Sequence, residues 1–246
     1  MTTHKRPDNR KASDLRPLTL TPGFVGTADG SCLIELGGTR VICTASFSPG
    51  VPKWRAGKGL GWVTAEYGML PASTGRRKSR PITKPDSRAT EIQRLIGRVL
   101  RSIVDDKKLG ENTIAIDCDV LEADGGTRTA SITGAYVALA IAIEAAAAKG
   151  LCHPKTLRSA VAAISVGVVQ GQALLDLNYI EDSTADVDMN IAMTRSGKFV
   201  EIQGTSEAAP FDGKALEQML ALARRGIRKL LAAQSVAITQ GRKKRK

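Results

Sequence analysis

Residues 117–135 read Asp-Cys-Asp-Val-Leu-Glu-Ala-Asp-Gly-Gly-Thr-Arg-Thr-Ala-Ser-Ile-Thr-Gly-Ala, and they contain the junction on which the fold depends. An alternating strand over 113–121 leads through two glycines to Thr127, Arg128 and a long apolar helix. A helix N-terminus carries unpaired N–H groups and the positive end of the macrodipole, and glycines let an anion approach the backbone. The pattern therefore predicts an anion site. The alternative is a tight turn whose Thr and Arg only cap the helix.

Apolar periodicity predicts the other elements. The helix over 129–148 is apolar on nearly all sides, so we expect it to be buried. Another helix begins near Thr90 and is amphipathic, with Arg94, Arg98 and Arg101 on its polar faces. The remaining elements are strands over 32–36, 39–47, 61–67, 161–169, 173–179, 186–193 and 198–203, a basic loop over 71–87, and a closing helix over 213–233.

This order of strands, helix, strands and helix is typical of an α+β protein with two halves of similar build. We expect one domain over 15–235, with halves at about 15–148 and 157–235. A basic segment (1–14) precedes it and a basic tail (236–246) follows it.

Apolar runs and cysteine usage indicate the compartment of the cell in which the protein is expected. No uninterrupted apolar run reaches the ~18 residues of a membrane span, and the N-terminus lacks the apolar stretch of a signal peptide, so no membrane is expected. The four cysteines are scattered, and three of them lie in strand-like apolar contexts that favour buried thiols. This fits a reducing cytoplasm and gives no support for zinc.

The net charge of +12 is concentrated in three segments. Residues 1–17 carry five basic and two acidic groups, residues 75–108 carry eleven and four, and the last six residues carry five basic groups. Such clusters attract polyanions, of which RNA and DNA are the common ones. Simple solubility is the alternative, and it explains the tail better than the dense cluster in the middle of the chain.

A second chemical feature is the acidic run over 181–190, in which Asp182 and Asp188 lie on either side of a Ser-Thr bend. Such a bend can bring two carboxylates to one Mg²⁺, which prefers one or two carboxylates together with water and phosphate oxygens. The alternative is a solvated turn. The chain has no Gly-x-x-x-x-Gly-Lys-Ser/Thr loop, and its two histidines have no motif partner, so the nucleophile could be inorganic phosphate itself.

Five segments, taken together, resemble ribonuclease PH. They are 61–71 (Gly-Trp-Val-Thr-Ala-Glu-Tyr-Gly-Met-Leu-Pro), 91–98 (Glu-Ile-Gln-Arg-Leu-Ile-Gly-Arg), 117–135, 181–190 and 200–205. The resemblance covers roughly residues 6 to 235. It implies two βαβ-containing halves with mixed sheets packed on helices, assembled as a homo-hexameric ring of three dimers. The implied activity is a phosphorolytic 3′→5′ exoribonuclease and tRNA nucleotidyltransferase, which trims tRNA precursors and other RNA 3′ ends, rRNA among them, to nucleoside diphosphates.

By the same resemblance, Gly126, Thr127 and Arg128 would bind phosphate and Arg88 would supply a second guanidinium. Asp182 and Asp188 would hold Mg²⁺ near the leaving 3′ oxygen. The resemblance thus makes Arg88, Arg128, Asp182 and Asp188 the catalytic set.

The sequence departs from the family's pattern over 72–87. There the family's individual residues cannot be transferred, but the basic residues Arg76, Arg77, Lys78 and Arg80 keep RNA contact as a hypothesis. A catalytically weak RNA-binding subunit of a phosphorolytic ring is the second interpretation. A DNA-binding regulator is disfavoured because no helix-turn-helix pattern occurs.

Overall fold

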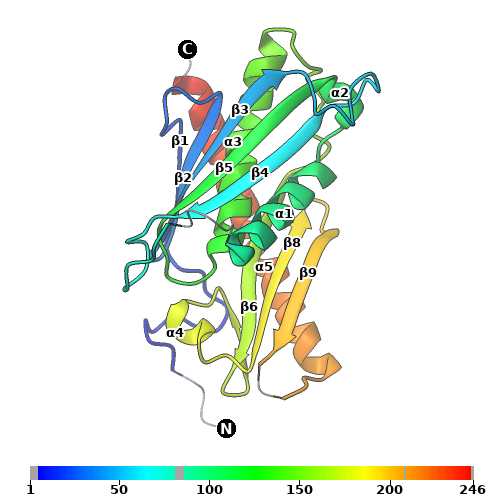
Figure 1. Ribbon diagram of the computed structural model, residues 1–246. Helices are drawn as coiled ribbons and strands as arrows, with labels where there is room; N and C mark the ends of the chain where they lie inside the picture. Colours follow the sequence, from blue (N-terminus) through cyan, green and yellow to red (C-terminus); the bar gives the residue numbers. More distant parts are fainter. Residues whose placement is uncertain (1–4, 81–85, 208, 245–246) are drawn as a thin grey trace.

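The computed structural model describes residues 5–80, 86–207 and 209–244. Two halves follow each other along the chain (Figure 1). The first contains β1 (Leu18–Pro22), β2 (Gly30–Leu36), β3 (Thr39–Pro49), β4 (Trp62–Met69), α1 (Ser87–Ser102), α2 (Asp106–Leu109), β5 (Asn112–Glu122) and α3 (Thr127–Ala148). The second contains β6 (Val161–Val169), β7 (Gln172–Leu175), α4 (Tyr179–Asp182), β8 (Val187–Thr194), β9 (Phe199–Ser206) and α5 (Gly213–Lys244).

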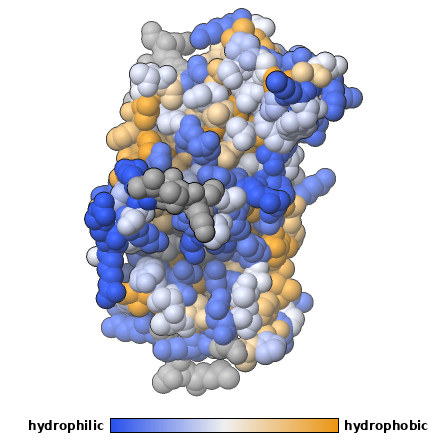
Figure 2. Space-filling view, in the orientation of Figure 1, coloured by the Kyte–Doolittle hydropathy of each residue, from blue (hydrophilic) through white to orange (hydrophobic). Residues whose placement is uncertain are grey.

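Each half has its own sheet. The first is mixed, in the order β1-β2-β3-β5-β4, with β4 parallel to β5; the second is antiparallel, in the order β7-β6-β8-β9. Strand β9 is an edge strand, and its Phe199 and Ile202 are 38% and 48% exposed. Hydrophobic surface gathers along the right-hand edge of the lower half, where β9 lies (Figures 1 and 2).

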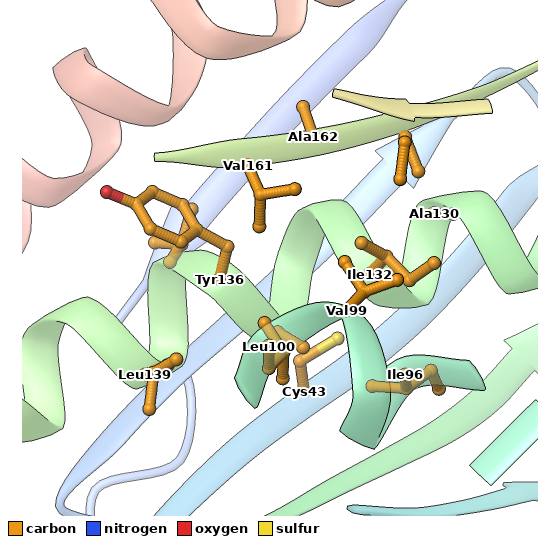
Figure 3. Packing of buried hydrophobic residues seen from close by; sticks show 14 of the residues in the cluster. Cys43, Ile96, Val99, Leu100, Ala130, Ile132, Tyr136, Leu139, Val161 and Ala162 are labelled. Atoms are coloured by element: carbon orange, nitrogen blue, oxygen red, sulfur yellow. The ribbon is translucent and has the colours of Figure 1, made fainter. Parts of the chain in front are cut away.

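Helix α3 joins the two halves. It packs against β2 and β3 of the first sheet and against β6 of the second, while α5 covers β6 and β7 (Figure 1). The side chains around it include Cys43, Val99, Leu100 and Val161, which come from both halves (Figure 3). The α+β fold with two similar halves and sheets packed on helices is therefore confirmed.

Helix α3 is buried, as its apolar faces predicted, although its length and composition also meet the criteria for a membrane span. By length and composition alone it could cross a membrane, with a mean hydropathy of 1.6 over an 18-residue window. However, 83% of that window is buried inside the protein, as in the core helix of a globular fold. The reason is that α3 has sheet residues on several sides, so it is apolar all round.

Other boundaries differ from the predicted ones. The hairpin across Gly37 and Gly38 is confirmed, as is the buried state of Cys32, Cys43 and Cys118. Strand β7 ends at Leu175 rather than at 179, and the short helix α4 follows it. Helix α5 continues to Lys244 instead of ending at 233, so residues 236–244 of the basic tail extend that helix.

The basic residues within 1–17 were expected to attract polyanions, but two arginines of this range face inward. Arg6 and Arg16 are almost fully buried, and they pair with the buried carboxylates of Glu181 and Asp176. These charges are neutralised within the protein, so this part of the expectation is wrong for these two side chains.

Candidate active site

The predicted anion site has the geometry of an open helix N-terminus. Gly125 and Gly126 have φ angles of +74° and +65°, and they turn the chain from β5 into α3. Gly126 is the N-cap and has no side chain to cap the helix. Within the described chain, the N–H groups of Gly126, Thr127 and Arg128 donate no hydrogen bond. They are therefore available to an anion.

Gly125 is needed for a second reason, which is its close approach to the other half. A Cβ on Gly125 would lie 2.7 Å from the carbonyl oxygen of Leu177 and 2.9 Å from the backbone nitrogen of Tyr179. Residues 124–126, which we call the phosphate loop after the anion site predicted there, therefore pack directly on the segment that leads into α4.

We expect Gly125→Ala to cost more free energy of unfolding than Gly171→Ala. Both glycines have a φ of +74°, but a Cβ on Gly171 would meet nothing within 4 Å. The matched substitution at Gly171 should cost about 1–2 kcal/mol for the left-handed backbone. Gly125→Ala should add roughly 1–3 kcal/mol for the overlap and displace the phosphate loop. Denaturant unfolding of both variants checks this, and equal losses would contradict the close packing.

Arg128 is held in place by two other elements. Its Nη1 donates to Oε1 of Gln203 on β9 at 2.8 Å, and its Nη2 lies 3.6 Å from Oε2 of Glu91 on α1. The side chain is 17% exposed, so it is both fixed and accessible. The side chain of Thr127 accepts a hydrogen bond from the Tyr67 hydroxyl at 2.9 Å. Burial raises the pKa of Tyr67, so it remains a protonated donor.

The two predicted carboxylates lie in the same cleft as the phosphate loop. Asp182 ends α4 and Asp188 lies in β8. Burial, and next the charge of Asp182, raise the pKa of Asp188 to about 6. Burial also raises the pKa of Asp182, against the charges of Arg88 and Arg128, which lower it. Burial thus disfavours the charged form of both carboxylates, and a bound cation would offset this cost.

These carboxylates fit a divalent cation. Oδ1 of Asp188 is buried and has no hydrogen-bond partner among the described residues, while Oδ2 accepts a hydrogen bond from Asn190 at 3.4 Å. An unsatisfied buried carboxylate oxygen beside a second carboxylate suits Mg²⁺. Over the described parts of the chain, no group of three or more His, Cys, Asp or Glu could hold a metal, so water and phosphate oxygens would complete the coordination.

Arg88 lies in the first turn of α1 and faces the same cleft. Its backbone N–H donates to the N-cap side chain of Asp86. Its guanidinium makes no hydrogen bond or ion pair with any residue described, and its charge lowers the pKa of Asp182. The guanidinium of Arg88, in the same cleft as Arg128, is therefore available for an anion.

Only two of the four basic residues predicted to contact RNA line the cleft. Arg76 and Lys78 line the cleft, whereas Arg77 and Arg80 are exposed and do not line it. Arg80 instead lies near Asp119 on β5. Burial, and next the charge of Asp117, raise the pKa of Asp119, and the charge of Arg80 opposes this rise. Of the predicted loop, residues 81–85 lie outside the described residues.

The cleft has a volume of about 1270 Å³ and is lined by both halves. Hydrophilic residues dominate the middle of the face drawn in Figure 2, between α1 above and α4 below. Several lining residues were not singled out from the sequence: Glu91, Ser165, Tyr179, Asn190, Gln203, Thr205 and Glu207. Four of these lie inside segments that carried the resemblance (91–98, 181–190 and 200–205). The resemblance could therefore have pointed to these four residues. Ser165, Tyr179 and Glu207 have no such signal and depend on the fold.

The N-terminus of α3 and the two carboxylates line one cleft, which both halves of the α+β fold form. Helix N-termini suit anions and paired carboxylates suit Mg²⁺, and a site that has both is compatible with phosphoryl transfer. Two family models match the chain in order. The model of the 3′ exoribonuclease family, domain 1 (RNase PH), matches residues 14–143, and that of domain 2 matches residues 159–226. The chain therefore belongs to the 3′ exoribonuclease (RNase PH) family.

Solved structures agree on the fold. Rice (Oryza sativa) Rrp46 superposes with a TM-score of 0.74 at 18% sequence identity, covering 95% of this chain and 100% of that one. An Archaeoglobus fulgidus exosome with RNA bound to the active site gives 0.78 at 23% identity, with 93% and 92% covered. An archaeal exosome core gives 0.74 at 22%, with 94% and 91% covered. At such identities the likeness shows the fold and no more.

Proposed function

We propose that the protein is a phosphate-dependent 3′→5′ exoribonuclease that removes 3′-terminal nucleotides as nucleoside diphosphates. One observation carries the proposal. The open N-terminus of α3 with Arg128 lies in the same cleft as Asp182 and the unsatisfied carboxylate of Asp188. An anion site and a cation site in one cleft are what phosphoryl transfer needs, since positioning and charge stabilisation supply most of its catalysis.

In this proposal, inorganic phosphate binds at the N–H groups of 126–128, the Thr127 hydroxyl and the guanidinium groups of Arg128 and Arg88. Two guanidinium forks match a doubly charged phosphate. The Thr127 hydroxyl accepts from Tyr67, so its own proton is free to donate to a phosphate oxygen.

The bound phosphate is the nucleophile. One of its oxygens attacks the phosphorus of the last phosphodiester, and the bond from that phosphorus to the 3′ oxygen of the preceding nucleotide breaks. The 3′ oxygen takes a proton and becomes the new RNA end, while the terminal nucleotide leaves as a diphosphate. The reverse reaction adds a nucleotide and releases phosphate. Mg²⁺ bound by Asp182 and Asp188 would supply positive charge to the phosphate oxygens and to the leaving oxygen.

The RNA would enter past the basic side of the cleft. Arg76 and Lys78 line it and can contact the ribose-phosphate backbone, which gives sequence-independent binding. Such contacts suit the 3′ ends of tRNA precursors and of other RNAs, which differ in sequence.

Incubation of a tRNA precursor with the protein tests the proposal. We expect nucleoside diphosphates only when RNA, Mg²⁺ and inorganic phosphate are all present, because phosphate is a reactant. Chromatography identifies the released nucleotide. Release of nucleoside monophosphates without phosphate would mean hydrolysis and would refute the proposal.

A second candidate is an RNA-binding ring subunit with weak or no activity. The solved structures favour it, because the similar chains are Rrp46 and exosome structures, and this fits a ring subunit better than it fits a free-standing enzyme. RNA binding without diphosphate release, in the same incubation, would establish this candidate in place of the first.

A ring is part of both candidates. The apolar edge at Phe199 and Ile202 of β9 offers surface for a neighbouring subunit. We propose a homo-hexamer, and light scattering of the purified chain would distinguish six copies from one or two.

A further inference from the structure

Arg16 lies just before β1, far from the cleft residues in sequence, and it is 3% exposed. Its first set of contacts is with one carboxylate. Nη2 donates to Oδ1 of Asp176 at 2.7 Å, and Nε and the backbone N–H donate to Oδ2 at 3.1 and 2.7 Å. Asp176 is fully buried and has a φ of +57°. Arg16 thereby holds the start of the segment that leads through α4 to Asp182.

Its second set of contacts is with the phosphate loop. Nη1 donates to the carbonyl oxygen of Asp124, and Nη2 lies 3.4 Å from the carbonyl oxygen of Gly125. The hydroxyl of Thr39 also donates to the Gly125 carbonyl, at 2.7 Å. Because a trans peptide directs its N–H opposite its carbonyl, this anchoring directs the N–H of Gly126 away from Arg16. The orientation of a donor in the anion site thus depends on Arg16 and Thr39.

We propose that Arg16 is a positioning residue that fixes the phosphate loop relative to the carboxylate side of the cleft. The inference rests on the proposed function of the cleft. One planar guanidinium serves both segments, which a lysine cannot do, because its ammonium has fewer donors and no rigid fork. The attacking phosphate and the cation would then keep a fixed separation, on which in-line attack depends.

The test compares Arg16→Lys with Arg6→Lys in the full chain. Arg6 makes an equally buried bidentate pair with Glu181, at 2.7 Å for both bonds, but it does not contact the phosphate loop. We expect Arg16→Lys to raise the KM for phosphate about tenfold or more, since a small misplacement of a reactant is costly. Arg6→Lys should leave this KM unchanged, whatever stability it loses.

A role limited to folding would lower the active fraction, and hence kcat, at an unchanged KM for phosphate. An unchanged KM in Arg16→Lys, or an equal rise in Arg6→Lys, would overturn the proposal. If Arg16→Lys yields no folded protein, Thr39→Val removes the other anchor of the Gly125 carbonyl and should raise the same KM; an unchanged KM there counts against the proposal.

A measurement that does not depend on turnover separates failure of the positioning proposal from failure of the proposed function. Titration of the metal-free wild-type chain with inorganic phosphate, followed calorimetrically, measures binding without turnover. If the wild type binds phosphate without degrading RNA, the exonuclease proposal fails, and the positioning proposal is tested by the Kd of each variant. Weaker binding in Arg16→Lys alone supports it, and equal Kd values refute it.

Discussion

Arg128→Ala is expected to lower the rate of phosphate-dependent RNA degradation by about 10²–10³-fold or more, because it removes a fixed, charge-assisted donor to the attacking phosphate. The fold should survive, since the partners of Arg128 are Gln203 and the exposed Glu91 at the cleft edge. Steady-state kinetics with varied phosphate measure the effect.

Arg40→Ala is the matched control, because Arg40 also pairs with carboxylates but lies on the exposed surface at Glu35 and Glu122. It should keep nearly wild-type activity, since exposed pairs contribute little. A folded Arg128→Ala protein with a near-normal rate would remove Arg128 from the phosphate site.

Asp188→Asn is expected to lower activity by at least about 10²-fold, because a neutral amide binds Mg²⁺ poorly and the cation supplies several kcal/mol of charge stabilisation. Mg²⁺ should raise the Tm of the wild type and leave that of the variant unchanged. Asp186→Asn is the control, since Asp186 lies two residues earlier and does not line the cleft. Equal responses to Mg²⁺ in both variants would exclude Asp188 as a ligand.

The same substitution should stabilise the metal-free protein. The pKa of Asp188 is raised from 3.8 to about 6, first by burial and then by Asp182. Folded protein therefore holds this proton more tightly than unfolded protein, so the contribution of Asp188 to stability is complete below pH 3.8 and is lost as the pH rises through about 6. Without Mg²⁺, Asp188→Asn should have the higher Tm at about pH 7.5, and this advantage should vanish near about pH 4. A lower Tm than wild type at the higher pH would contradict this.

The sequence predicted the α+β fold, most strands and the junction at Gly125 and Gly126 because local patterns determine these features. A strand has a period of two, a helix has a period of 3.6, and paired glycines mark a turn. It also identified Thr127, Arg128, Asp182 and Asp188 as candidates, and the structure brings all four into one cleft.

The hydrogen-bond partners of the site residues and the burial of charged side chains could not be predicted, because they depend on contacts between residues far apart in the sequence. Tyr67 donates to Thr127, and Gln203 accepts from Arg128, but neither partner has a local signal for that role. Arg6 and Arg16 look like solvated charges in the sequence, whereas tertiary pairing with Glu181 and Asp176 makes them buried. Composition alone cannot separate a charge that attracts RNA from one that is neutralised inside the protein.

The cleft is shared by the two halves, and this has a consequence during synthesis. The phosphate loop directly follows β5 in the first half, whereas Asp188, Gln203 and Glu207 lie in the second half and are added later. A growing chain therefore carries the glycine turn and the N-terminus of α3 before it has the acidic side of the cleft. The cleft lining is therefore complete only when the chain has been synthesised as far as Glu207.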